Sequence, residues 1–361
     1  MSVAVSGESI TFNDSSVQNT AATGFGFKNR IINGAMVIDQ RNAGASVTPT
    51  TLAYTLDRWS AAEQTDGSMT VQQSSTAATG FTNSLLVTVT SADASLGATQ
   101  YAVLRQAVEG FNVADLGWGT ANAQTITLSF WVRSSLTGTF GGAIQNSAQD
   151  RSYPFSYTIS SANTFEQKTI TIAGDTTGTW LTTNGTGLAL WLGLGVGSTY
   201  SGTAGAWAGA LYFAPTGATN LIGTNGATFY ITGVQLERGS NATSFEFIDY
   251  GRQLIQCQRY FQIMEGFIGQ TDNTTNVQVS FQFKTEMRAS PTVSTNGVIQ
   301  ISKPGIADYS QSSAAITISG SRVSTRGIMV NIGNYTGLTA QNMYLHNVAT
   351  NNAGVPLSSE L

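Results

Sequence analysis

Aromatic residues in glycine-rich segments are the feature of this sequence with the clearest chemistry. Trp118 lies in "DLGWGTAN" and Trp180 in "GTWLTTNG", while Tyr200 and Trp207 both lie in "GSTYSGTAGAW". Aromatic rings pack against the apolar face of a sugar, and neighbouring Thr, Asn and Gln side chains hydrogen-bond to its hydroxyls. We therefore predict a carbohydrate-binding surface built from these rings. The alternative is that they cap the core or pack between subunits.

Residues that could carry catalysis are scarce. His346 is the only histidine, and the sequence contains no GxSxG, HExxH, GxxxxGK[ST] or CxxC pattern. We expect His346 to be structural and the single cysteine, Cys257, to be a buried apolar residue. The sequence predicts no metal, no cofactor and no enzymatic activity.

A glycosidase is the main enzymatic alternative, because it needs only two carboxylates roughly 5 to 10 Å apart. Glu237, Glu246 and Asp249 form the densest acidic group of the chain. They alternate with Arg238 and Arg252, so ion pairs at a domain junction explain them as well. A long parallel β-helix, a common frame of polysaccharide depolymerases, would need an internal repeat, and none is visible.

The chain carries little charge. Lys, Arg, Asp and Glu make up 10% of its 361 residues, with a net charge of −4, where about a quarter is usual. No basic cluster is present, so we expect neither nucleic-acid nor anionic-membrane binding. No apolar run reaches the roughly 18 residues of a membrane span. The segment "MSVAVSGES" lacks a basic region followed by an apolar block, so we expect no Sec export. Because only one cysteine occurs, we expect synthesis in a reducing cytosol.

Alternating apolar residues predict β-strands throughout the chain. "TITLSFWVR" and "LALWLGLGV" each place apolar side chains on one face, with Trp131 and Trp191 on the other. Trp131 and Trp191 are therefore both further candidates for sugar stacking or for a subunit interface. Many short strands without intervening helices indicate a β-sandwich. The residues expected to face the core are Ile126, Leu128, Phe130, Val132, Leu188, Leu190, Leu192, Leu194 and Val196.

A second, smaller β-domain follows. In "VQVSFQF", Val277, Val279, Phe281 and Phe283 alternate with polar residues. The intervening "YGRQLIQCQRYFQIM" lacks this alternation and is built of helix-tolerant residues, with Leu254, Cys257 and Phe261 at helical spacing. We predict an all-β protein with a stem over residues 1–28, a β-sandwich over 29–249, a linking helix over 250–264 and a second β-sandwich over 265–361.

The N-terminal segment "ITFNDSSVQNTAA" is too short and polar to bury itself, but three copies around an axis could bury Ile10 and Phe12. It resembles the "ITF-x-DGT-x-Q-x-TAA" segments of bacteriophage tail-fibre stems, with Ser15 in place of the usual glycine. The matched residues are Ile10, Thr11, Phe12, Asp14, Gln18, Thr20, Ala21 and Ala22. The resemblance implies a trimeric stem and particle anchor formed by Ile10, Phe12 and Gln18.

Longer segments carry a second resemblance. "FKNRIINGAMVIDQRNAG", "YTLDRWS" and "ITGVQLERGSNATSFEFIDYGRQLIQCQRYFQ" resemble the jelly-roll module of many phage tail-fibre and virion-appendage proteins, which is also similar to some carbohydrate-binding modules. By this resemblance Trp59 is a core residue. Arg58 and Asp57 are expected to form a local ion pair. The C-terminal segments "FKTEMRASPTV" and "SSEL" are also similar to these proteins.

These resemblances imply a homotrimeric fibre or spike of the virion, made in the host cytoplasm. Its N-terminus would contact other virion proteins (capsid, portal or tail), and its outer domains would act in receptor binding, attaching the particle to host-surface glycans. Two alternatives are a passive capsid or tail decoration and a glycan-degrading depolymerase.

Overall fold

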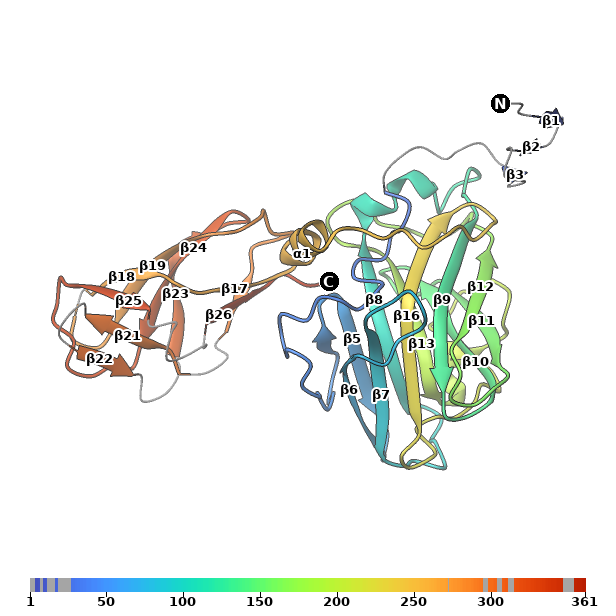
Figure 1. The fold of residues 1–361 in the computed structure, drawn as a ribbon, viewed down its shortest axis with the longest axis horizontal. Coiled ribbons are helices and arrows are strands. Elements are labelled where there is room, and N and C mark those ends of the chain that lie inside the picture. The colour runs from blue at the N-terminus through green and yellow to red at the C-terminus, as the bar shows by residue number, and fades with distance from the viewer. Residues whose placement is uncertain are drawn as a thin grey trace.

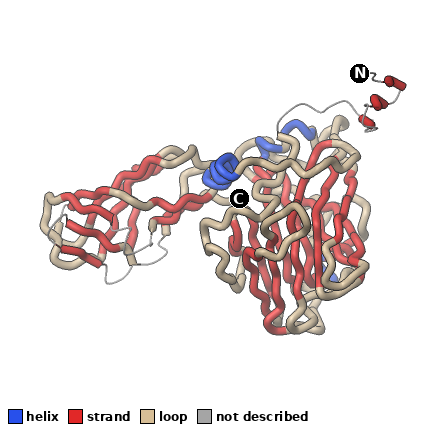
Figure 2. Tube along the Cα trace, in the orientation of Figure 1, coloured by secondary structure: helices blue, strands red, loops and turns tan. Residues whose placement is uncertain are grey.

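The computed structural model is nearly all β, with one α-helix in the part of the chain that it describes (Figures 1 and 2). It describes residues 27–271, 273–294, 298–303, 307–310, 315–346 and 354–361, and the backbone of three short strands nearer the N-terminus. A larger and a smaller β-domain lie on either side of the helix (Figure 1). The predicted all-β fold class is confirmed.

The three short N-terminal strands form a small antiparallel sheet. They are β1 (Ala4–Ser6), β2 (Ser9–Thr11) and β3 (Val17–Gln18), and Ile10 lies opposite Gln18. Phe12 lies outside the described residues. The trimeric stem and the particle anchor therefore stay predictions.

The larger domain is a sandwich of two antiparallel sheets. The six-stranded sheet has the order β11 (Ser152–Ile159), β10 (Gly138–Gln145), β13 (Thr186–Val196), β8 (Tyr101–Glu109), β5 (Trp59–Gln64) and β4 (Ala53–Leu56). The five-stranded sheet has the order β12 (Glu166–Ile172), β9 (Ile126–Ser134), β16 (Thr228–Arg238), β7 (Ser84–Ser91) and β6 (Ser68–Ser74).

Short elements complete this domain. Two 3₁₀-helices, η1 (Gly110–Asn112) and η2 (Ala114–Leu116), follow β8. A third, η3 (Ser198–Tyr200), follows β13 and leads into a small parallel pair, β14 (Ser201–Gly202) and β15 (Ala214–Pro215). Trp118 follows η2, Tyr200 lies in η3 and Trp207 lies between β14 and β15.

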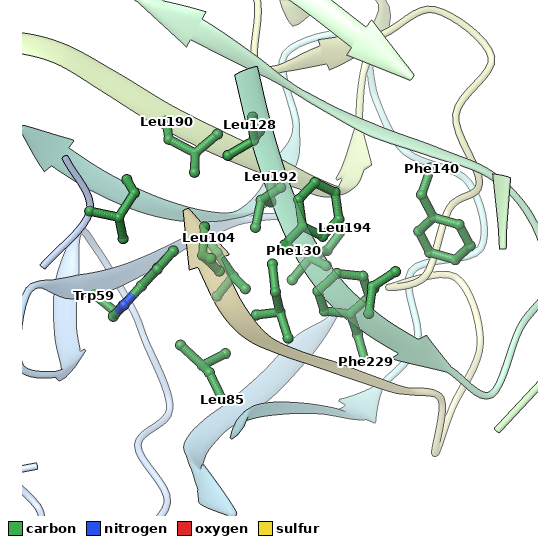
Figure 3. Packing of buried hydrophobic residues seen from close by; sticks show 14 of the residues in the cluster. Trp59, Leu85, Leu104, Leu128, Phe130, Phe140, Leu190, Leu192, Leu194 and Phe229 are labelled. Carbon is green, nitrogen blue, oxygen red and sulfur yellow. The ribbon is translucent and has the colours of Figure 1, made fainter. Parts of the chain in front are cut away.

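The core of the sandwich lies between the two sheets. Leu128 and Phe130 of β9 share one apolar cluster with Leu190 and Leu192 of β13 (Figure 3). All the residues predicted to face inward are buried except Val196. Trp59 is fully buried, as expected, and its indole N–H donates to the carbonyl of Asn33. The two-residue alternation of the sequence therefore places the core correctly.

Val196 is the exception, and a β-bulge explains it. Gly193 and Gly195 pair with the successive residues Val103 and Ala102 of β8, so β13 contains one extra residue at this point. An extra residue reverses the alternation of all the side chains that follow it. Val196 consequently packs with Trp191 on the outer face, and its predicted inward orientation is wrong.

The smaller domain contains a seven-stranded and a three-stranded sheet. The seven-stranded sheet has the order β22 (Ala307–Ser310), β21 (Gln300–Lys303), β25 (Met343–His346), β18 (Ile268–Thr271), β19 (Val277–Gln282), β24 (Gly327–Gly333) and β23 (Ala315–Val323). The other sheet has the order β17 (Phe261–Met264), β26 (Val355–Ser358) and β20 (Thr292–Val293). The predicted core residues Val277, Val279 and Phe281 are buried, and Phe283 packs at the edge of the same cluster.

The linking helix is shorter than predicted. Helix α1 spans Tyr250–Gln258, and the Asp249 side chain caps it by accepting from the backbone N–H of Arg252 at 3.0 Å. Residues Phe261–Met264 form β17 and pair with β26, so the predicted helix end at residue 264 is wrong. Pairing with a strand distant in sequence overrides the local helical tendency here. Cys257 is fully buried, as expected, and burial raises the pKa of its thiol.

A buried ion pair joins the end of the chain to the sandwich. Arg58 is 1% exposed and pairs with Glu360, which also accepts from Arg41 at 2.8 Å. The ring of Tyr260 lies 3.6 Å from the Arg58 guanidinium. Because a buried charge is costly unless it is paired, these contacts fix the chain end against β5.

The expected ion pair between Asp57 and Arg58 does not form. Asp57 instead accepts from the backbone N–H and the side-chain amide of Gln40, both at 2.6 Å. Burial raises the pKa of Asp57 to about 6, and the hydrogen bonds from Gln40 oppose this shift. The sequence interpretation was wrong because the true partner of Arg58 is 302 residues away.

A second buried carboxylate strengthens the junction between the domains. Glu109, at the end of β8, accepts from the Arg259 guanidinium at 2.6 and 2.9 Å and from the Tyr260 hydroxyl at 2.6 Å. Burial alone would raise the pKa of Glu109, but these donors hold it below its usual value. Arg288 adds hydrogen bonds to the carbonyls of Asn184, Ser359 and Glu360.

Replacing Glu360 tests how much this junction stabilises the protein. Glu360→Gln would leave Arg58 buried without a carboxylate, so we expect the free energy of unfolding to fall by about 3–5 kcal/mol in denaturant titrations. The control is Glu286→Gln, which breaks the exposed pair with Arg326 and should leave stability unchanged. Equal stability of the two variants would contradict a structural role for the buried pair.

Candidate functional site

Three of the predicted aromatic residues come together at one edge of the sandwich. Trp118 follows η2, Trp180 lies between β12 and β13, and Trp207 lies between β14 and β15. Their ring centroids are 4.6 Å (Trp118–Trp180), 5.4 Å (Trp118–Trp207) and 5.4 Å (Trp180–Trp207) apart. The interplanar angles are 84°, 81° and 79°, so each ring presents an edge to a neighbour's face. We call these three residues the tryptophan cluster.

Backbone hydrogen bonds fix the orientation of each ring. The indole N–H of Trp118 donates to the Gln124 carbonyl at 2.7 Å. Trp180 donates to Thr177 at 3.1 Å, and Trp207 donates to Ala173 at 2.8 Å. Because all three N–H groups are already bonded, the cluster has only ring faces and edges to offer to a ligand.

The three rings differ in exposure. Trp118 is 8% exposed and belongs to the main core, whereas Trp180 and Trp207 are half-buried at the edge of that core. The cavity between Trp118, Trp180 and Leu181 has a volume of about 10 Å³, room for about one water molecule. A sugar ring does not fit between the rings, so only the outward sides of Trp180 and Trp207 are accessible. Trp118 supports them from beneath.

A paired arginine lies beside the tryptophan cluster. Arg151 donates to both carboxylate oxygens of Asp175, at 2.7 and 2.9 Å. Burial alone would raise the pKa of Asp175, but the Arg151 and Thr177 donors hold it below its usual value. The two opposite charges cancel, so this part of the surface is close to neutral.

Two further residues complete the surface, and neither was a predicted site residue. Tyr153 lies next to Trp207, with ring centroids 5.2 Å apart. Gly178 has a φ of +77°, and a Cβ there would lie 2.5 Å from the Cγ of Arg151. Glycine is therefore required for the loop to close over Arg151. The alternation in "SYPFSYTI" could have shown that Tyr153 lies on a strand, but not that it meets Trp207.

Trp191 and Tyr200 belong to a different cluster. Trp191 lies on the outer face of β13, as predicted, but Phe213 packs against it at 4.5 Å. Tyr200 contacts the same Phe213 at 5.2 Å and Tyr101 at 5.6 Å. Trp191 is 6% exposed, so its ring is not accessible for stacking on a sugar. The sequence could not show that the segment after β13 folds back over its outer face.

The acidic residues considered for catalysis hold backbone segments in place. Glu237 accepts from the backbone N–H and the hydroxyl of Thr243, at 2.8 and 2.7 Å. Glu246 accepts from the backbone N–H of Asn29 at 2.6 Å, and Asp249 caps α1. Each of these carboxylates therefore has a structural partner.

His346 is buried and is held by ring stacking and a backbone hydrogen bond. His346 is 6% exposed, stacks on Phe267 at 4.6 Å and accepts from the backbone N–H of Gly266 at its Nδ1.

Over the described ranges, no three His, Cys, Asp or Glu side chains gather as a metal ion would require. Within those ranges, too, no helix has the length and apolar character needed to cross a membrane.

Comparisons with known proteins give only distant similarities. No protein-family model matches this chain, and no curated protein matches it. Among solved structures, the enzymatically active domain of tailspike protein 4 from bacteriophage CBA120 is 13% identical, with a TM-score of 0.30. That match covers 58% of this chain and 21% of the tailspike chain.

Two smaller proteins are matched over almost their whole length. A putative sugar-binding protein from Bacteroides thetaiotaomicron is 12% identical, with a TM-score of 0.33, and the match covers 59% of this chain and 100% of that one. The family 11 carbohydrate-binding module from Clostridium thermocellum, solved with a mixed-linked tetrasaccharide, is 10% identical, with a TM-score of 0.29. That match covers 55% of this chain and 98% of the module.

Proposed function

We propose that this chain is a fibre or spike protein of a bacteriophage virion, and that its larger domain attaches the particle to glycans on the host surface. The observation that carries the proposal is the convergence of Trp180 and Trp207, half-buried and adjacent, from two separate loops. Two indole rings held by backbone hydrogen bonds form a rigid apolar surface, which costs little entropy when a ligand binds.

The chemistry around the rings favours a neutral sugar. Arg151 and Asp175 neutralise each other, and Thr177 and Tyr153 supply hydroxyl groups nearby. Only 10% of the chain is charged, so contacts to sugar hydroxyls through neutral polar groups are the main interaction this surface can make. A single site of this kind binds weakly, and several sites on one particle would supply the strength through avidity.

The proposed assembly is a homotrimer anchored to other virion proteins through the N-terminal segment. Its support is the resemblance of that segment to tail-fibre stems and the small size of the β1–β3 sheet, which is marginal alone. Light scattering of the full chain should give about three times the chain mass of 37.9 kDa. A mass of one chain at micromolar concentration would contradict the trimer.

Substitution of the accessible rings tests the binding role. Trp180→Ala and Trp207→Ala should each lower the affinity of the labelled protein for host cells by about tenfold or more, because each removes one ring face. Tyr250→Ala is the control, since it removes an aromatic side chain that is 64% exposed on α1. Thermal unfolding of each variant separates lost binding from lost folding.

Two outcomes would count against the proposal. Folded Trp180→Ala and Trp207→Ala variants that bind cells as well as the Tyr250→Ala control would remove the tryptophan cluster from the binding site. If the unaltered protein binds no candidate host, the chain is a passive decoration of the capsid or tail.

A further inference from the structure

The outer face of the five-stranded sheet carries a second group of aromatic residues, separate from the tryptophan cluster. On β9, Trp131 and Arg133 are the two side chains that are not buried. The strand register places Arg133 opposite Tyr230, and Tyr230 opposite Leu86 of β7. In the next row, Trp131 lies between Thr232 of β16 and Gln167 of β12. Neither row contains a carboxylate.

Arg133 differs from the other arginines of the structure. Of the arginines whose side chains the structure describes, it is the one with neither an ion pair nor a hydrogen bond, and its Nε is buried without a partner. The rings of Tyr230 and Phe165 flank its guanidinium at 4.9 and 6.0 Å. These rings hold the cation by its faces and leave the N–H groups at its edge for an acceptor.

Trp131 also lacks the contacts that hold the other surface tryptophans. Its indole N–H has no hydrogen-bond partner among the described residues, whereas Trp180 and Trp207 both donate to backbone carbonyls. Trp131 is half-buried, and no ring of the described chain packs against it. An accessible ring and a free donor therefore lie beside an unpaired cation.

We propose that this face binds a carboxylated saccharide, a hexuronic acid unit or a sialic-acid-type sugar within a polysaccharide. The sugar ring packs on Trp131, and its carboxylate accepts from Arg133 through two parallel hydrogen bonds. Residues two apart on one strand face are separated by about 7 Å, a distance that one acidic sugar spans between ring and carboxylate. The Gln167 side chain, which is exposed beside Trp131, supplies an amide for the hydroxyls. The attraction of opposite charges makes this ligand distinct from the neutral sugar proposed for the tryptophan cluster.

Titration of acidic polysaccharides into the full chain tests the proposal. The probes are polygalacturonate, alginate and polysialic acid, with carboxyl-reduced polygalacturonate as the neutral ligand control. We expect binding to at least one acidic polymer, and at least a tenfold loss of affinity when its carboxylates are reduced or when Arg133→Gln or Trp131→Ala is introduced. Arg252→Gln is the matched protein control, because it removes the same charge from a side chain that is 75% exposed on α1. It should bind like the unaltered protein.

Three results would overturn the proposal. One is the absence of binding to all three acidic polymers, and another is equal binding of the acidic and the carboxyl-reduced polymer. The third is unchanged affinity in Arg133→Gln alongside a lower unfolding temperature, which would mean that Arg133 only supports Tyr230 and Phe165. If Arg133→Gln does not fold, Arg133→Lys keeps the charge but lacks the two parallel donors, and it should still lower the affinity relative to Arg252→Gln.

Discussion

The buried ion pair between Arg58 and Glu360 is the interaction on which the arrangement of the two β-domains depends. Arg58 belongs to the turn before β5, and Glu360 follows β26, so the pair joins the beginning of the larger domain to the end of the chain. A buried cation without a partner costs several kcal/mol. If the chain end moved away from the sandwich, Arg58 would therefore lose its carboxylate partner or become exposed to solvent. The buried Glu109 pairs with Arg259 directly after the helix, so it too ties this junction to the larger domain.

This use of charge also determines the character of the surface. Only 10% of the residues are charged, and several of the carboxylates, including Glu360, Glu109 and Asp175, are buried in ion pairs. Trp131, Trp180 and Trp207 remain half-buried at the surface, and neutral polar side chains such as Gln167 and Thr177 are exposed. Recognition by such a surface depends on ring faces and on single hydrogen-bonding groups. The unpaired Arg133 is an exception, because each of the other arginines whose side chains the structure describes has an ion pair or a hydrogen bond.

Much of the fold could be predicted from the sequence, because alternation is a local signal. It identified the core residues of β9 and β13 and the second β-domain, and it failed at Val196, where a bulge reversed the faces. The helix end was misplaced because β17 is formed by pairing with β26, which is far away in the sequence. The prediction that Arg58 pairs with Asp57 is wrong for the same reason, because its partner Glu360 is also far away in the sequence.

The candidate site was predictable only in part. Glycine-rich context indicated that Trp118, Trp180 and Trp207 lie in loops, and the structure brings these three together. Sequence patterns could not show which ring would be buried, because that depends on how the loops fold over one another. Trp118 and Trp191 are covered by chain segments that carry no alternation, so their burial could not be read from neighbouring residues.

The most direct test of glycan attachment is binding of the labelled full chain to intact candidate host cells, measured before and after periodate oxidation of the cell surface. Periodate cleaves sugar vicinal diols and leaves most surface protein intact. Glycan attachment predicts strong binding that is lost after oxidation. Binding that survives oxidation unchanged would contradict it and would point to a protein receptor.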